Sequence, residues 1–274
     1  MTQTYADFHQ RSLAARDAFW AEQARRIDWQ TPPQQVCDTS RPPFARWFVG
    51  GTTNLCHNAV DRHAATRPDD RALIWVSTEV GQEKVYSFTQ LQQEVEAFAA
   101  LLRAQGVGEG DRVLIYLPMI PEAAFAMLAC ARIGAIHSVV FGGFASMSLA
   151  SRIDDASPKL IVSADAGSRG GKVVAYKPLL DEAITLAAHK PERVLMVDRG
   201  LASFTPVAGR DLDYAALRQA HWGSRVPVTW LESNRISYTL YTSGTTGKPK
   251  GVQRDVGGYA VALATSMDYI FGGK

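Results

Sequence analysis

The stretch Tyr241-Thr-Ser-Gly-Thr-Thr-Gly-Lys-Pro-Lys-Gly-Val252 decides how the rest of the chain is interpreted. It follows an apolar, strand-like run at 236–241 and combines hydroxyl side chains, glycines and two lysines. Glycines allow successive backbone N–H groups to point into one concavity, and lysines beside them add positive charge. The stretch therefore predicts a loop that binds a polyphosphate. The candidate residues are Thr242, Ser243, Gly244, Thr245, Thr246, Gly247, Lys248 and Lys250.

This stretch differs from a Walker A loop. The Walker A pattern begins with a glycine where this chain has Thr242, and it places Ser or Thr after the lysine, where this chain has Pro249. Proline has no N–H and holds the preceding residue extended, so we do not expect Lys248 to open a helix. The alternative is an ordinary loop between a strand and a helix. Flexible linkers rarely carry two lysines at fixed offsets, which favours the phosphate-binding interpretation.

The same stretch resembles the phosphate-binding signature of the adenylate-forming superfamily. That superfamily includes acyl-CoA synthetases, luciferases and the adenylation domains of peptide synthetases. The resemblance implies an enzyme that binds ATP and activates a carboxylate.

The first 60 residues predict an N-terminal arm. Residues 5–26 have the spacing of an amphipathic helix, and residues 29–51 are rich in proline and aromatic residues, which predicts an extended segment packed on a neighbouring body. The segment Pro42-Pro-Phe-Ala-Arg-Trp-Phe-Val-Gly-Gly51 resembles the N-terminal extension of acetyl- and propionyl-CoA synthetases. We expect two parts, an arm at 1–60 and a partial AMP-binding domain at 61–274.

The remainder of the chain predicts an α/β fold. Apolar strands alternate with helices, which implies right-handed βαβ units and a mostly parallel sheet with helices on both faces. The resemblance identifies this as the first part of the large N-terminal domain of an adenylate-forming enzyme. Ligands of such sheets bind beyond the carboxyl ends of the strands. Helices are expected at 54–66, 88–105, 121–133, 146–155, 176–188 and 211–219, and strands at 72–77, 84–87, 112–117, 135–141, 159–163, 193–197 and 235–241.

Two further glycine-rich stretches follow predicted strands, Phe141-Gly-Gly-Phe144 and Ser168-Arg-Gly-Gly-Lys172. A tight turn and a solvated surface loop are the alternatives. Cations beside two glycines can converge on an anion. These stretches resemble two segments of the CoA site in acetyl- and propionyl-CoA synthetases. The resemblance implies that the second stretch contacts the phosphorylated nucleotide of coenzyme A and that Phe141, in the first stretch, stacks on the adenine. The candidate CoA-binding residues are Phe141, Gly142, Gly143, Arg169, Gly170, Gly171 and Lys172, the last a point charge where the family more often has arginine.

The composition excludes several other functions. The chain has 274 residues, 46% hydrophobic and 20% charged, with a formal net charge of +2, and it contains no basic run of the kind that binds nucleic acid. Its three cysteines are widely spaced and its six histidines lack metal-ligand spacing, so we expect neither disulfides nor a metal site. The apolar stretch 123–144 is interrupted by Arg132 and His137, and the first residues do not form a signal peptide. We expect a soluble, cytoplasmic protein with no nucleic-acid or membrane partner.

Together these features resemble the short-chain acyl-CoA synthetases, whose substrates are a small carboxylate, ATP and CoA, with Mg²⁺ implied by the family. Gln253-Arg254-Asp255 stands where acetate-specific members have a histidine-containing run, which favours propionate. Acetate is the alternative substrate.

The resemblance covers nearly the whole chain but less than half of a family member. The family places the acyl pocket, the adenine and ribose contacts, the magnesium ligand and the mobile C-terminal domain beyond Lys274. We therefore expect no complete catalytic set and no turnover by these 274 residues alone, with a catalytically inactive nucleotide- or CoA-binding module as the alternative. The oligomeric state is left open.

Overall fold

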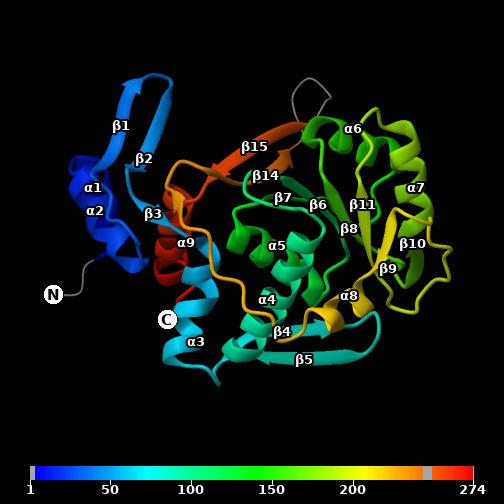
Figure 1. The fold of residues 1–274 in the computed structure, drawn as a ribbon. Helices are drawn as coiled ribbons and strands as arrows, with labels where there is room; N and C mark the ends of the chain where they lie inside the picture. The colour runs from blue at the N-terminus through cyan, green and yellow to red at the C-terminus, as the bar shows by residue number, and fades with distance from the viewer. Residues whose placement is uncertain (1–3, 243–248, 274) are drawn as a thin grey trace.

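The computed structural model describes residues 4–242 and 249–273, and for Arg169 the backbone only. Its centre is a seven-stranded sheet in which six neighbouring strands are parallel and the last is antiparallel (Figure 1). The predicted mostly parallel sheet is confirmed. In spatial order the strands are β12 (Asp211–Asp213), β11 (Arg193–Val197), β8 (Leu160–Ala164), β6 (Arg112–Tyr116), β7 (Ile136–Val139), β14 (Ile236–Thr242) and β15 (Lys250–Asp255).

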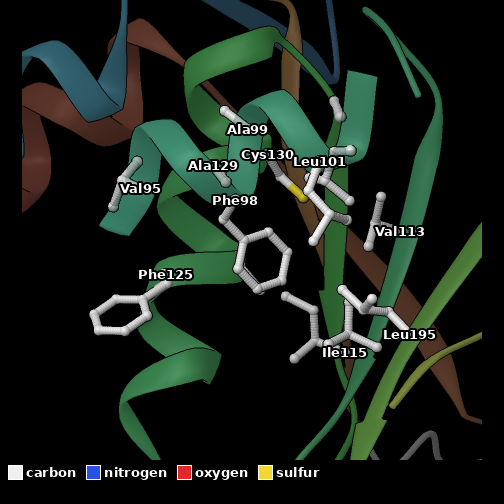
Figure 2. Packing of buried hydrophobic residues seen from close by; sticks show 14 of the residues in the cluster. Val95, Phe98, Ala99, Leu101, Val113, Ile115, Phe125, Ala129, Cys130 and Leu195 are labelled. Carbon is white, nitrogen blue, oxygen red and sulfur yellow. The ribbon is translucent and has the colours of Figure 1, made fainter. Parts of the chain in front are cut away.

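Helices cover both faces of this sheet because successive strand residues point to opposite sides. One face packs on α4 (Phe88–Ala104), α5 (Pro121–Ile133) and α8 (Tyr214–Ala220). Figure 2 shows the ring of Phe98 directed toward Ile115 of the sheet, with Phe125 further along the same layer. The opposite face packs on α6 (Ser146–Ala156) and α7 (Tyr176–Leu186). The predicted helices on both faces are therefore present.

The helix ends follow the expected local chemistry. Ser87 and Gln90 form a capping box at the start of α4, in which each side chain accepts a hydrogen bond from the other residue's backbone N–H. Pro121 occupies the first turn of α5, and Gly134 ends that helix at a φ of 77°. These residues therefore define where α4 begins and where α5 begins and ends, and so where the next strand enters the sheet.

The arm differs from the prediction in its details. The single helix expected at 5–26 is wrong, because the chain breaks at Ala15 into α1 (Tyr5–Ala14) and α2 (Arg16–Gln23), with a 3₁₀ turn at Ala24–Arg26. The extended segment contains a hairpin of β1 (Gln35–Arg41) and β2 (Phe44–Val49). Its rings do pack on a neighbouring body, as expected.

That neighbouring body is α9 (Gly257–Tyr269), the last described helix. Phe48 packs with Ala260 and Val261 of α9, and Arg26 forms an ion pair with Asp268 at 2.6 Å. The arm and α9 lie side by side, with both chain termini on this side of the molecule (Figure 1). The arm is thus held by the segment that follows the predicted phosphate loop.

The remaining elements are short. A π-helical turn at His57–Asp61 leads into α3 (Arg62–Thr66), and β4 (Arg71–Ser77) pairs with β5 (Gln82–Ser87). The first three residues of the helix expected at 211–219 form β12 instead, and β7 ends at Val139 rather than at 141. Besides β1, β2, β12 and β15, four short strands were not expected from the sequence pattern: β3 (Thr52–Thr53), β13 (Leu231–Glu232), and the pair β9 (Ala166–Arg169) and β10 (Lys172–Ala175). Within the described ranges, none of the helices combines the length and apolar character that crossing a membrane requires.

Candidate functional site

The two glycine-rich stretches lie where the sequence places them, after the carboxyl ends of central strands. Phe141–Phe144 connects β7 to α6, and Ser168–Lys172 follows β8. The second stretch is the turn of the two-stranded antiparallel hairpin β9–β10, which we call the cationic hairpin (residues 166–175). Since β7 and β8 both flank β6 in the parallel sheet, the two stretches leave the same edge of the sheet.

Tyr176 brings these two stretches together. A methyl group added at Gly142 would lie 2.6 Å from the Cζ atom of Tyr176, and one added at Gly167 would lie 2.8 Å from the same atom. Real side chains do not approach so closely, so both positions require glycine. The backbone of each glycine lies against the phenol of Tyr176, which is 5% exposed.

Tyr116 fixes the first stretch from below. Its ring packs on Tyr176 with centroids 4.9 Å apart, and its hydroxyl accepts a hydrogen bond from the N–H of Gly143 and donates one to the carbonyl of Phe144, each at 3.3 Å. Burial raises the pKa of Tyr116 to about 12, so this hydroxyl keeps its proton at neutral pH. Gly143 has a φ of 93°, which favours glycine. The loop that carries Phe141 is therefore fixed by a buried tyrosine.

The turn of the cationic hairpin consists of Gly170 and Gly171, with φ values of 58° and 76°. A methyl group at either position would meet nothing within 4 Å, so these glycines are required by conformation and not by crowding. Arg169 and Lys172 are the register pair that closes the turn, and Lys172 is exposed. The backbone of the hairpin thus places two cationic residues directly beside its turn.

Glu79, in the turn between β4 and β5, holds the hairpin from the side. Its carboxylate accepts a hydrogen bond from the N–H of Ser168 at 3.0 Å and pairs with Arg199 at 2.7 Å. Arg199 in turn donates to the carbonyl of Ala166 at 2.8 Å. The buried Asp165 accepts hydrogen bonds from the backbone N–H groups of residues 199, 201 and 202. The loop after β11 is thereby fixed to the base of the hairpin.

The predicted phosphate loop connects β14 to β15. Of its candidate residues, Thr242 and Lys250 form the last register pair of these strands, whereas Ser243, Gly244, Thr245, Thr246, Gly247 and Lys248 lie outside the described residues. The described segment after the loop is the strand β15 (Lys250–Asp255), and the next helix, α9, begins at Gly257. The extended conformation expected around Pro249 agrees with a strand that begins at Lys250.

The base of the phosphate loop contacts α6, the helix that follows Phe141–Phe144. The hydroxyl of Tyr241 donates to Asp155 at 2.6 Å. The guanidinium of Arg152 lies 5.5 Å from the ring centroid of Tyr241 and 4.6 Å from that of Phe144. Burial, together with the Asp155 carboxylate, raises the pKa of Tyr241. One helix therefore contacts both Phe144, at the end of the first glycine-rich stretch, and Tyr241, at the base of the phosphate loop.

Residues 4–242 and 249–273 contain no group of three or more His, Cys, Asp or Glu side chains that could hold a metal ion. The family implies Mg²⁺, but we assign no magnesium ligand to these residues. His57 instead pairs with Asp28 at 3.0 Å, and His63 packs on the ring of Phe88. Both histidines have structural partners.

Tyr176, Glu79 and Arg199 are site residues that the sequence did not predict. Glu79 and Arg199 are 120 residues apart in the chain, so no local pattern pairs them. Tyr176 begins a helix, where an aromatic residue has no distinctive meaning. The only available signal was its position shortly after two glycine-containing turns.

Comparison with known proteins identifies the family. Residues 60–273 match the family described as AMP-binding enzyme, and residues 5–59 match the family described as acetyl-coenzyme A synthetase N-terminus. The chain belongs to the AMP-binding enzyme family.

Individual relatives narrow the similarity to acyl-CoA synthetases. The chain is 67% identical over 271 residues to propionate–CoA ligase of Salmonella typhimurium, which covers 99% of this chain and 43% of that protein. It is 45% identical over 272 residues to acetyl-coenzyme A synthetase of Methylobacterium radiotolerans, covering 97% of this chain and 42% of the relative. The structure is similar to that of acetoacetyl-CoA synthetase from Streptomyces lividans, with a TM-score of 0.87 and 30% sequence identity. The match covers 96% of this chain and 40% of that protein. The chain thus spans less than half the length of these relatives.

Proposed function

We propose that the natural polypeptide containing these residues is an ATP-dependent acid–thiol ligase that converts a short-chain carboxylate, preferably propionate, to its CoA thioester. The observation that carries this proposal is the difference in identity between two groups of relatives. The chain is 67% and 66% identical to propionate–CoA ligases of Salmonella typhimurium and Escherichia coli, but 45% identical to an acetyl-coenzyme A synthetase over a similar length.

The proposed reaction has two steps. A carboxylate oxygen attacks the α-phosphorus of ATP, and the bond to the β-phosphate oxygen breaks, which gives acyl-adenylate and pyrophosphate. The thiolate of CoA then attacks the acyl carbon, and the bond to the AMP oxygen breaks. The protein contributes positioning and neutralises the charge that develops on the departing phosphate.

The phosphate loop serves the first step. Thr242 to Lys250 supplies backbone N–H groups, hydroxyl groups and the ammonium groups of Lys248 and Lys250, which are suitable partners for the β- and γ-phosphates. The antiparallel pairing of Thr242 with Lys250 supports this role because it returns both ends of the loop to one point on the sheet edge.

The candidate CoA site serves the second step. Phe141 offers an aromatic face for adenine, and Arg169 and Lys172 offer cations for the nucleotide phosphates. Tyr176 supports this assignment because it contacts the backbone of both contributing segments at Gly142 and Gly167. An aromatic shelf and a cationic turn held at a fixed spacing suit a phosphorylated adenosine.

The test uses the longest natural polypeptide that contains residues 1–274. Incubation with propionate, ATP, Mg²⁺ and CoA should yield AMP, pyrophosphate and propionyl-CoA, detected by mass spectrometry. Because one methylene in an apolar pocket changes kcat/KM by about tenfold or more, propionate should exceed acetate by at least about tenfold. Absence of thioester would overturn the ligase assignment. A higher kcat/KM for acetate would overturn the substrate assignment alone.

A further inference from the structure

Tyr176 occupies a position between two parts of the candidate CoA site that are separate in sequence. Its ring lies against the backbone of Gly142, next to Phe141, and against Gly167, in the first strand of the cationic hairpin. Pro118, at the carboxyl end of β6, is the next neighbour on the Gly167 side, where an added methyl group would lie 3.3 Å from its Cβ atom. The phenol therefore acts as a spacer with a backbone on each side.

The spacer is backed by rigid structure. Tyr176 is the first residue of α7, its N–H donates to the carbonyl of Asp165 at 2.8 Å, and its ring packs on Tyr116. The hairpin on its outer side forms its own two-stranded sheet and has no register pairing with the central sheet. The chain joins the hairpin to β8 and α7 at its base, and Tyr176 is the side chain that lies between its Gly167 backbone and that of Gly142.

Building on the proposed function, we propose that Tyr176 is a positioning residue that sets the distance between the adenine-stacking face of Phe141 and the cationic turn Arg169–Lys172. This distance determines how strongly the protein distinguishes CoA, which carries a 3′-phosphate, from dephospho-CoA, which lacks it. A shorter side chain at position 176 lets the hairpin approach Gly142. The cations then move relative to a nucleotide stacked on Phe141.

The predicted effect is selective. A displacement of about 1 Å is sufficient to cost up to 100-fold in a positioned interaction. We expect Tyr176→Leu to weaken CoA binding about tenfold while the Kd of dephospho-CoA changes less than about twofold. Tyr176→Phe removes only the hydroxyl, the atom nearest to both glycines, and should reduce the CoA preference about threefold. Gly167→Ala should also weaken CoA binding, because its methyl group collides with Tyr176. In the double variant with Tyr176→Leu that collision is absent, so Gly167→Ala should add little further loss of CoA binding.

The experiment measures the Kd of CoA and of dephospho-CoA by titration calorimetry on the longest natural polypeptide, without acyl substrate. Tyr214→Leu is the matched control, because Tyr214 also begins a helix after a strand, is also 5% exposed, and packs on Phe98 instead of the hairpin. It should keep the wild-type ratio of the two Kd values. The inference is overturned if both Tyr176 variants keep that ratio, or if Tyr214→Leu changes it equally. If Tyr176→Leu does not fold, the ratio for Tyr176→Phe decides.

A separate assay separates this inference from the proposed function. Propionate-dependent exchange between ATP and pyrophosphate reports the first half-reaction and does not involve the hairpin, so the Tyr176 variants should retain it. A wild-type protein without exchange would overturn the ligase proposal, whereas the ratio of the two Kd values would still decide the role of Tyr176.

Discussion

The cationic hairpin and the strand pair β14–β15 are both antiparallel pairs with glycines and cations at their connection, yet they are held in different ways. β14 is hydrogen-bonded into the seven-stranded sheet beside β7, and β15 continues that sheet. The hairpin β9–β10 stands apart and is fixed by the side chains of Tyr176, Glu79 and Arg199. We therefore expect substitution of a supporting side chain to affect the hairpin more than the base of the phosphate loop, which the backbone ladder holds.

This comparison predicts that activity depends more on a ligand-binding side chain of the phosphate loop than on the residues that support the loop. Lys248 lies outside the described residues, and its role rests on its place in the loop sequence. Removal of one preorganised charge partner costs about 100-fold in comparable sites, so Lys248→Ala should slow propionate-dependent ATP–pyrophosphate exchange by about that factor. Binding of CoA should remain at the wild-type level.

Lys84→Ala provides the control, because this lysine is exposed on β5 and lies over the ring of Trp75. Exchange by that variant should equal exchange by the wild type. Unchanged exchange by Lys248→Ala would remove the charge-neutralising role from the phosphate loop.

The hairpin should be sensitive at its supports, of which Glu79 is the most accessible to experiment. Glu79 is an acid close to a proposed anion site, so its removal has two opposing effects: it releases the hairpin and it removes a repulsive charge. Since hydrogen bonds to charged groups contribute about 1.5–3 kcal/mol, the loss of support should dominate, and Glu79→Ala should raise the Kd of CoA about five- to tenfold.

Glu79→Gln separates the two effects, because the amide oxygen still accepts from Ser168 while the charge is absent. Its Kd for CoA should lie between those of the wild type and Glu79→Ala. Glu109→Ala breaks a comparable acid–arginine pair, with Arg235 at 2.8 Å, away from the hairpin, and should leave the Kd unchanged. Tighter CoA binding by Glu79→Ala would show that repulsion outweighs support.

Most elements of the central sheet could be predicted from the sequence, whereas the hairpin held by distant side chains could not. The strands 112–117 and 193–197 and the helices around Phe98 and Phe125 were predictable, because buried elements of a parallel sheet carry a periodic apolar pattern. The glycine stretches were found because their residue types are unusual. The hairpin β9–β10 was not predicted, since only four residues form each strand and their pairing depends on contacts with Tyr176 and Glu79. The hairpin β1–β2 likewise depends on long-range contacts, since Phe48 packs on α9.

The smallest predicted effect concerns the junction of β14 with β7. The register pair there is Tyr238 and His137, whose rings stack with centroids 5.4 Å apart, and Nδ1 of His137 is buried without a hydrogen-bond partner among the described residues. Burial lowers the pKa of His137 to about 4, below the value of about 6.5 expected in the unfolded chain. Because the unfolded chain binds this proton more readily, the folded state loses stability as the pH falls from about 6.5 to about 4.

His137→Phe keeps an aromatic partner for Tyr238 and removes the titrating group. Between pH 7 and pH 4.5 the Tm of the wild type should therefore fall by about 5 °C more than the Tm of this variant, measured by differential scanning calorimetry on the same polypeptide. His9→Phe, on the exposed helix α1, should retain the wild-type dependence on pH. If the Tm of the wild type and that of His137→Phe fall equally with pH, His137 can be protonated in the folded protein. Water would then reach the junction between β14 and β7 in the folded protein. The attachment of β14–β15 to the parallel sheet would be less well shielded than its packing implies, and it would differ less from the attachment of the hairpin.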